Sequence, residues 1–329
     1  MVQIGYHASH EQFTPQALLH YVQVAATAGF TGVMASDHLA PWSARQGQSG
    51  FVWSWLGAAM QATTLSFGMV NAPGQRYHPV IIAQAAATLA AMFPERLWCA
   101  FGSGQLMNEH ITGQRWPAKA ERNARLLECV EVIRALWAGE TVSYAGAAIQ
   151  VDEAYLYTRP AKPPLLLGAA ITPETAAWVA SWADGIITVH KPLDQQQAFI
   201  EAFRSNGGEH KPIFLQAQTS YAPTYEAALA GAYDQWRNAA LPSTISTELR
   251  MPSQFDQLVD LIPREKLLEH IRISADLGQH REWLQQDIEL GFDRIYIHNV
   301  NQEQLPFLHA FGEHVLPTLD RKESKESSV

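Results

Sequence analysis

Cysteine and positive charge are both scarce in this chain. Only Cys99 and Cys129 occur in 329 residues. The chain has 23 Lys and Arg residues, fewer than its 32 Asp and Glu residues. Both cysteines lie within apolar or helical patterns, which supports neither a disulfide framework nor a thiolate metal site. The formal net charge of -9 argues against nucleic acid and anionic membrane surfaces as partners, because clustered Lys and Arg bind both. A small molecule is therefore the expected ligand.

Two further kinds of pattern are missing. No apolar run reaches the roughly 18 residues that a membrane span needs, and the N-terminus lacks a basic region followed by an apolar core. We therefore expect a cytoplasmic protein with no membrane partner. The 13 histidines are spread out, without an HExxH motif or a closely spaced His and Cys pair, so no metal site is predicted.

Short apolar runs with strand character recur along the chain, and helical patterns separate them. Eight such runs are the number that a closed parallel barrel requires. An open doubly wound sheet would alternate in a similar way, but no GxGxxG turn follows the first run. We therefore predict an α/β fold, a (β/α)8 TIM barrel with insertions at the C-terminal ends of the strands. The predicted strands are residues 2–8, 32–38, 65–71, 97–104, 163–170, 184–190, 212–220 and 294–300.

Helix-type spacing fills the connections between these runs. In the first connection Thr14 precedes Pro15 and the apolar positions stop at Gly29, which indicates a capped helix with a glycine end. Later helices are predicted at residues 79–92, 118–137, 173–182, 193–203, 225–236 and 304–315.

Two stretches interrupt the alternation. Residues 39–57 are predicted to form a long loop rich in Gly, Ser and Trp, and residues from about 240 to 282 an insertion between the seventh and eighth strands. Long excursions at the C-terminal ends of barrel strands usually shape the substrate site. The prediction is one domain over residues 1–318, followed by a flexible polar tail at 319–329.

The second predicted strand ends in Asp37 and His38, where a barrel carries its reactive groups. A histidine beside a carboxylate suits a general acid or base. Alternatively, the pair only caps the following loop. Trp42, Trp53 and Trp55 follow closely and offer flat surfaces for a ring system, although core packing would explain them equally well.

The ends of the fourth and fifth strands are the other candidate sites. The turn at 102–104 allows close approach of the backbone to a ligand, and Asn108 beyond it offers both a donor and an acceptor. Residues 169–172 run into a helix start at Pro173, which makes a plausible phosphate site from free N–H groups and the helix dipole. The alternative is an ordinary loop of small residues.

Six long segments together resemble the luciferase-like monooxygenase superfamily, and most of all its branch of deazaflavin (F420)-dependent glucose-6-phosphate dehydrogenases. The segments are GYHASHEQFTP, ASDHLAPW, RYHPVIIAQAAATLAAMFPERL, FGSGQLMNEHITG, RLLECVEVIRALWAGETVSYAG and WADGIITVHK. The resemblance covers most of the chain, from the first strand to about residue 191 and again near the last strand.

The resemblance implies roles for individual residues. His38 matches the family's catalytic histidine, Trp42 its active-site tryptophan and Asp37 an aspartate of the cofactor site. Val70–Asn71 falls where the superfamily has a non-proline cis peptide behind the cofactor ring. Residues that match the ring-lining turn and the phosphate-binding loop are Ser103, Gly104, Gln105, Asn108, Ala169, Ala170, Ile171 and Thr172.

Three departures from the family pattern bear on the substrate. Gln105 stands where the sugar-phosphate dehydrogenases carry a carboxylic proton donor, and it cannot titrate. Of the cations that bind the sugar phosphate, Lys191 remains as a candidate substrate-binding residue with Trp55. The other two positions align more loosely with Ser246 and His270. Glucose 6-phosphate is therefore disfavoured.

Three functions are compatible with these residues. The first is an FMN-dependent oxidoreductase or monooxygenase of a small organic substrate, with His38 assisting proton transfer, Gln105 at the ring and a flavin reductase as a partner. The second is an F420-dependent dehydrogenase of an alcohol or sugar-like substrate. The third is a non-catalytic flavin-binding protein. A homodimer is expected under each of them.

Overall fold

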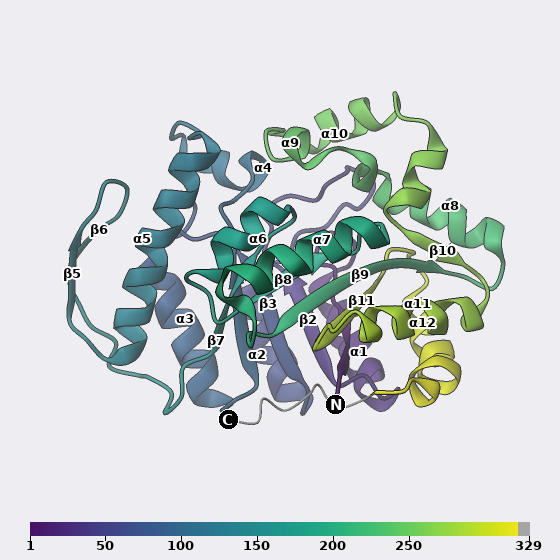
Figure 1. Cartoon of the computed structure of the whole chain (residues 1–329), viewed down its shortest axis with the longest axis horizontal. Helices are drawn as coiled ribbons and strands as arrows, with labels where there is room; N and C mark the ends of the chain where they lie inside the picture. Colours follow the sequence, from purple (N-terminus) through teal and green to yellow (C-terminus); the bar gives the residue numbers. More distant parts are fainter. Residues whose placement is uncertain (322–329) are drawn as a thin grey trace.

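The computed structural model describes residues 1–321 and has a closed barrel of parallel strands at its centre (Figure 1). The strands pair in the order β1-β2-β3-β4-β7-β8-β9-β11, and the pairing of β11 with β1 closes the ring. The predicted (β/α)8 barrel is thereby confirmed. Its strands are β1 Gln3–His7, β2 Gly32–Ser36, β3 Ser66–Asn71, β4 Leu97–Phe101, β7 Leu165–Ala169, β8 Gly185–Val189, β9 Ile213–Tyr221 and β11 Arg294–Asn299.

Helices surround the barrel and cover the outward-facing apolar residues of its strands (Figure 1). Local chemistry starts several of them: the side chains of Thr14, Thr172 and Thr224 each accept a hydrogen bond from a backbone N–H three residues on. The surrounding helices are α1 Pro15–Thr27, α2 Val52–Ala62, α3 Pro79–Met92, α5 Lys119–Ala138, α6 Pro173–Ala180, α7 Leu193–Phe203, α11 Leu277–Glu289 and α12 Gln304–Ala310.

Large side chains fill the barrel interior near its N-terminal end. Trp98 and Tyr296 are buried there, and the Trp98 Nε1–H donates to the Tyr296 hydroxyl at 2.8 Å. Glycines on neighbouring strands make room for them: a Cβ added at Gly68 would lie 1.7 Å from Trp98 Cε2, and one added at Gly5 would lie 2.4 Å from Tyr296 Cδ1. The interior is therefore a packed core, and a ligand must approach from the opposite, C-terminal end.

The longest connection follows β9 and lies across the C-terminal end of the barrel. It contains α8 Tyr225–Trp236, α9 Ser243–Ser246, α10 Pro252–Val259 and the short strand β10 Arg272–Ser274. β10 pairs with the end of β9, from Thr219 to Tyr221, so the excursion is tied to the barrel. The insertion predicted at about 240–282 falls largely within this connection, which ends where α11 begins at Leu277 as a barrel helix.

Three sequence-based expectations need correction. The loop predicted at 39–57 is wrong beyond Phe51, because Val52 begins α2. The hairpin of β5 Val142–Ala145 and β6 Gln150–Ala154 was not predicted, and it stands away from the barrel (Figure 1). In the proposed tail, Leu319 is buried and the Asp320 N–H donates to Gln285, so the chain is held through residue 321, and residues 322–329 lie outside the described part.

Within residues 1–321, no helix combines the length and the apolar composition that crossing a bilayer requires.

Candidate active site

His38 and a buried carboxylate meet at the mouth of the barrel. The chain leaves β2 at Ser36, and His38 is two residues further on. Its Nδ1 lies 2.7 Å from Oε1 of Glu11, which the loop after β1 contributes. The His38 side chain is 14% exposed and that of Glu11 only 1%. Because Glu11 occupies Nδ1, the Nε2 atom of His38 is the ring nitrogen left for a ligand.

Glu11 is an anion at this position. Burial raises its pKa, but the hydrogen bond and the charge of His38 outweigh burial and lower that pKa to about 2. Its second oxygen accepts a hydrogen bond from the Ser9 hydroxyl at 2.9 Å. The carboxylate on Nδ1 fixes the orientation of the imidazole, so its Nε2 can accept a proton from a bound molecule.

Two other imidazoles lie beneath this pair inside the barrel. His7 on β1 and His298 on β11 have ring centroids 4.2 Å apart, and both are buried. Burial lowers the pKa of His298 to about 3 and that of His7 well below its ordinary value. Both rings are therefore neutral near pH 7 and do not compete with His38 for protons.

Asp37 is buried and anchored from two directions. The Asn71 Nδ2 donates to Asp37 Oδ2 at 2.7 Å, and the Arg76 Nη2 donates to the backbone oxygen of Asp37 at 2.6 Å. Arg76 Nη2 also lies 3.2 Å from Asp37 Oδ2. The other carboxylate oxygen, Oδ1, is buried and has no hydrogen-bond partner in the described part of the chain. An acceptor in that position is available to a ligand.

Glu109 extends this cluster. Its Oε2 accepts a hydrogen bond from the Arg76 backbone N–H at 2.7 Å, and its Oε1 lies 3.9 Å from Arg76 Nε. Burial raises the pKa of Glu109 above its usual value, although contacts with Arg76 and the charge of Arg125 oppose the rise. The buried guanidinium of Arg76 therefore joins the ends of β2, β3 and β4 through two carboxylates.

The turn after β4 lies beside the segment that follows His38. The Leu39 N–H donates to Asn108 Oδ1 at 2.8 Å, and Asn108 Nδ2 donates to Gln105 Oε1 at 3.1 Å. Gly104 has a φ of 88°, and an added Cβ would lie 3.2 Å from Glu109 Cγ. The turn therefore requires glycine at this position, and Ser103 and Gly104 present mainly backbone to the mouth.

Of the three tryptophans, Trp42 is the one at the mouth. Its ring centroid lies 5.1 Å from that of His38, in an edge-to-face arrangement. Trp53 and Trp55 are instead in α2 and are buried in the hydrophobic core. The Trp55 Nε1–H donates to the Pro15 backbone oxygen at 3.1 Å, so we leave Trp55 out of the proposed substrate site.

The cis peptide implied at Val70–Asn71 is not present. No cis peptide bond occurs among residues 1–321. β3 remains extended through Asn71, which pairs with Phe101 of β4, and this regular ladder keeps the backbone trans. The two residues still lie beside Asp37, because the Asp37 N–H donates to the Val70 oxygen at 2.9 Å.

The end of β7 has fewer free donors than expected. The Ala170 N–H donates to the Ile187 oxygen at 3.1 Å, and the Ala170 side chain is buried. Ile171 is 46% exposed, and Thr172 caps α6 by accepting a hydrogen bond from the Thr175 N–H. An anion at this strand end would therefore meet Ile171, Thr172 and the start of α6, with Ala169 facing the barrel interior.

Lys191 does not lie beside the His38–Glu11 pair. Its Nζ donates to Thr188 Oγ1 at 2.6 Å and to the Val189 oxygen at 3.1 Å, and lies 4.6 Å from the Phe199 ring centroid of α7. Of the other two aligned positions, Ser246 lies in α9 and His270 directly precedes β10. Burial lowers the pKa of His270, so it adds no full charge near pH 7.

Three residues of this site, Glu11, Arg76 and Glu109, were not predicted from the sequence. Glu11 and His38 are 27 positions apart, and no spacing rule pairs residues on different strand ends. The signal that could have found Glu11 is a carboxylate just beyond the first predicted strand. Among the described residues, no group of three or more His, Cys, Asp and Glu side chains is arranged to bind a metal ion.

The chain is similar in sequence and in fold to known oxidoreductases. Residues 1–294 match the family model described as luciferase-like monooxygenase. An F420-dependent glucose-6-phosphate dehydrogenase of Beutenbergia cavernae is 34% identical, over 99% of this chain and 100% of that protein. An F420-dependent hydroxymycolic acid dehydrogenase of Mycobacterium tuberculosis is 31% identical, over 96% and 88% of the two chains.

Among solved structures, an F420-dependent secondary alcohol dehydrogenase in complex with an F420-acetone adduct superposes with a TM-score of 0.89. It is 28% identical in sequence, and the match covers 96% of this chain and 98% of that one.

Proposed function

The chain belongs to the luciferase-like monooxygenase family, and on that premise we propose that it is an F420-dependent dehydrogenase that oxidises an alcohol. That it is an oxidoreductase follows from its relatives, and the coenzyme and the substrate class are the proposal. The three relatives described above are all named as F420-dependent. The expectation of FMN, with its flavin reductase, is less well supported, and the non-catalytic alternative has no support among these relatives.

The residues at the barrel mouth fit the ring of the coenzyme. Asp37 Oδ1 and Asn71 Oδ1 are buried acceptors without partners, and such atoms need a donor from a ligand or water. Gly104 has a left-handed backbone, and a Cβ added there would crowd Glu109 and Trp116, so the turn presents backbone and not a side chain. The residues that we propose to contact the ring are Asp37, Val70, Asn71, Ser103, Gly104 and Asn108, with Gln105 at its edge.

The phosphate of the coenzyme is proposed to bind where β7 meets α6. Ile171→Glu should weaken F420 binding by at least tenfold, about 1.4 kcal/mol, because it puts a carboxylate beside the anion. Ile171 suits this test better than Ala170, whose replacement would bury a charge in the core. Fluorescence titration of F420 measures the effect, and Ile171→Gln, equally long but neutral, serves as the control. Equal affinity of Ile171→Glu and the wild type would place the phosphate elsewhere.

His38 and Glu11 supply the acid–base chemistry of the proposed reaction. When bound, the deazaflavin supplies a two-electron acceptor for hydride from the carbon that bears the hydroxyl. The Nε2 of His38 takes the hydroxyl proton, and the Glu11 carboxylate stabilises the imidazolium that results. Trp42, edge-on to His38, keeps the ring in place and forms one side of the space above it. The alcohol leaves as an aldehyde or a ketone.

Glu11→Gln should lower kcat about tenfold or more while folding survives, because the amide keeps the shape of the carboxylate and loses its charge. Steady-state kinetics with a secondary alcohol measure the effect. An unchanged kcat would mean that Glu11 has only a structural role.

Glucose 6-phosphate should not be turned over at an ordinary enzymatic rate. The mouth has Gln105 instead of an acid, and loss of two charge-assisted phosphate contacts costs roughly 1.5 to 3 kcal/mol each. Assays with F420 and either glucose 6-phosphate or a panel of secondary alcohols compare the two classes. Rapid turnover of the sugar phosphate, with the alcohols inert, would overturn this choice of substrate.

The coenzyme itself is tested by titration. The purified chain should bind F420 at least tenfold more tightly than FMN, as measured by absorbance and fluorescence changes of each coenzyme. Tighter binding of FMN, together with oxygen consumption in the presence of reduced FMN, would instead favour the monooxygenase.

A further inference from the structure

The inward-facing side chains at the barrel mouth are polar where β1, β9 and β11 end. Side chains on a strand alternate between its two faces. Gly5 and Tyr296 face the packed interior, because a Cβ added at Gly5 would contact the Tyr296 ring. His7 and His298 lie two positions further along the same strands, so they face the same way at the mouth. Gln216 of β9, in contact with His298, completes this polar half.

The other half of the same layer is apolar. Val70 of β3 and Ala169 of β7 pack against the hydrophobic residues of the barrel interior. The coenzyme ring, as proposed above, lies on this half. The polar half is left for the substrate, and the charges of both Glu11 and His38 act on His7. The polar half is therefore on the side of the mouth where the acid–base chemistry occurs.

His7 is the member of the polar half that lacks hydrogen-bond partners. Both ring nitrogens of His298 are paired, Nδ1 with Gln216 Nε2 at 3.2 Å and Nε2 with Gln12 Oε1 at 3.0 Å. His7 is 2% exposed, and neither its Nδ1 nor its Nε2 has a partner among the described residues. A buried polar atom without a partner is costly, so an oxygen atom of a ligand that reaches it is favoured.

The charges around His7 favour an uncharged partner. Burial lowers the pKa of His7 well below its ordinary value, and burial lowers those of the neighbouring His298 and His10 to about 3 and about 4. All three rings are therefore neutral near pH 7. Glu11 is an anion here, so it would repel a carboxylate or phosphate on the substrate. A hydroxyl both donates and accepts hydrogen bonds, so it fits either tautomer of a neutral imidazole.

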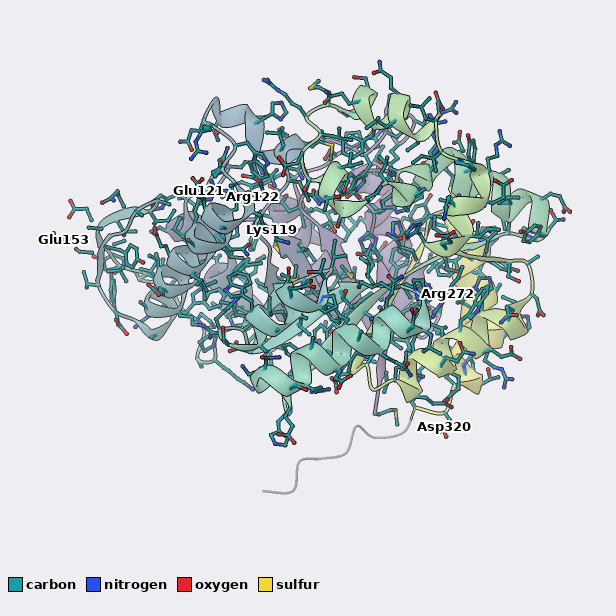
Figure 2. All side chains as sticks on the ribbon, turned by 45° about the horizontal axis from the view of Figure 1, so that its top comes forward. Lys119, Glu121, Arg122, Glu153, Arg272 and Asp320 are labelled. Carbon is teal, nitrogen blue, oxygen red and sulfur yellow. The ribbon has the colours of Figure 1, made fainter. Side chains whose placement is uncertain are left out.

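Two arginines at this end of the fold do not change that balance. Figure 2 labels Arg122 on α5 and Arg272 on β10, on different sides of the barrel. Arg122 pairs with Glu248, and Arg272 pairs with Asp287. Because a carboxylate already balances each guanidinium, neither favours an anionic group on the substrate.

We propose that His7 is a substrate-binding residue that selects alcohols with a second, uncharged oxygen near the carbon that is oxidised. The inference rests on the proposed dehydrogenase reaction. His38 takes the proton of the hydroxyl that reacts, and His7 forms a hydrogen bond with the second oxygen. No proton passes through His7, so a diol leaves as a hydroxyketone with its second hydroxyl unchanged.

Propylene glycol and isopropanol test this selection, because they differ only in the second hydroxyl. The kcat/KM of the wild type should be at least fivefold higher for propylene glycol, the usual effect of one hydrogen bond between neutral groups. His7→Phe should remove this preference, since it keeps a flat ring against His298 and loses both nitrogens. His7→Gln, which retains hydrogen-bonding atoms, should keep part of the preference.

His10→Phe is the matched control. His10 is also buried beside Glu11, but its ring packs edge-on against Trp55 of α2, at 4.7 Å, and not in the barrel interior. The ratio of the two kcat/KM values should therefore stay at its wild-type level in this variant. Titration with F420 checks folding, and His7→Phe should bind the coenzyme with wild-type affinity. If His7→Phe does not fold, the ratio measured for the wild type still decides.

Calorimetric binding of the two alcohols separates this inference from the proposed reaction. If neither alcohol is oxidised with F420, the proposed dehydrogenase is wrong. Binding then tests His7 by the same comparison: propylene glycol should bind at least fivefold more tightly than isopropanol to the wild type, and equally to His7→Phe. If the wild type oxidises both alcohols equally well, or His7→Phe keeps the preference, the dehydrogenase stands and the role of His7 is overturned.

Discussion

Replacing His38 with alanine is expected to lower turnover by about 10²- to 10⁴-fold, the usual contribution of a general acid or base. His38 is 14% exposed at the barrel mouth, and its Nε2 is the ring nitrogen that Glu11 leaves available. Affinity for F420 should change little, because His38 is not among the residues that we propose to contact the ring. Single-turnover and steady-state kinetics with a secondary alcohol separate the two quantities.

A matched control for this variant is His20→Ala on the exposed side of α1, which should keep full activity. Adding imidazole to His38→Ala should restore part of the rate, more so above pH 7, where the free base predominates. Turnover of His38→Ala within threefold of the wild type would remove His38 from the mechanism, whatever coenzyme the protein uses.

Gly68→Ala is expected to be the most damaging small substitution in the barrel, with a loss of more than about 3 kcal/mol in the free energy of unfolding or no folded protein at all. The added Cβ would lie 1.7 Å from Trp98 Cε2 and 2.1 Å from its Cδ2. Trp98 cannot move aside, because it is 2% exposed and donates a hydrogen bond to Tyr296. Denaturant unfolding followed by circular dichroism measures the change.

Gly57→Ala in α2 is the control, since its added Cβ would meet only Leu89 Cδ2, at 3.8 Å, and alanine favours a helix by up to about 1 kcal/mol. Combining Gly68→Ala with Trp98→Leu should recover part of the lost stability, because the smaller side chain removes the clash. A fully stable Gly68→Ala single variant would show that the packing of Trp98 does not limit the barrel.

Local patterns were sufficient to predict the barrel. The helices at 79–92, 193–203 and 225–236 begin and end as predicted, since a proline, a capping threonine or an apolar stripe marks their ends. α2 was missed because its N-cap residue, Phe51, makes no side-chain cap and the helix is rich in tryptophan and small residues. The β5–β6 hairpin carried a detectable signal in the alternation of residues 142–145, but it lies outside the barrel repeat.

The site was predictable only in part, because its contacts join distant segments. Asp37 and His38 follow a strand and could be identified by position, whereas Arg76 reaches Asp37 across 39 positions. For Lys191 the resemblance implied a role in substrate binding, which stays a prediction. Its side chain lies under α7, in contact with Thr188 and Phe199.

The pairing of β1 with β11 sets a condition on how the protein folds while it is being synthesised. The first strand has no partner on one side until residues 294–299 have left the ribosome, so the ring of hydrogen bonds stays open for most of translation. At about 5 to 20 residues per second, that wait lasts roughly 15 to 60 s. During this time β1, and later β9 once it has been made, expose unpaired edges to which other nascent chains could add strands. Expression yield should therefore depend on chaperones, and truncation before residue 299 should leave aggregates and not a smaller stable barrel.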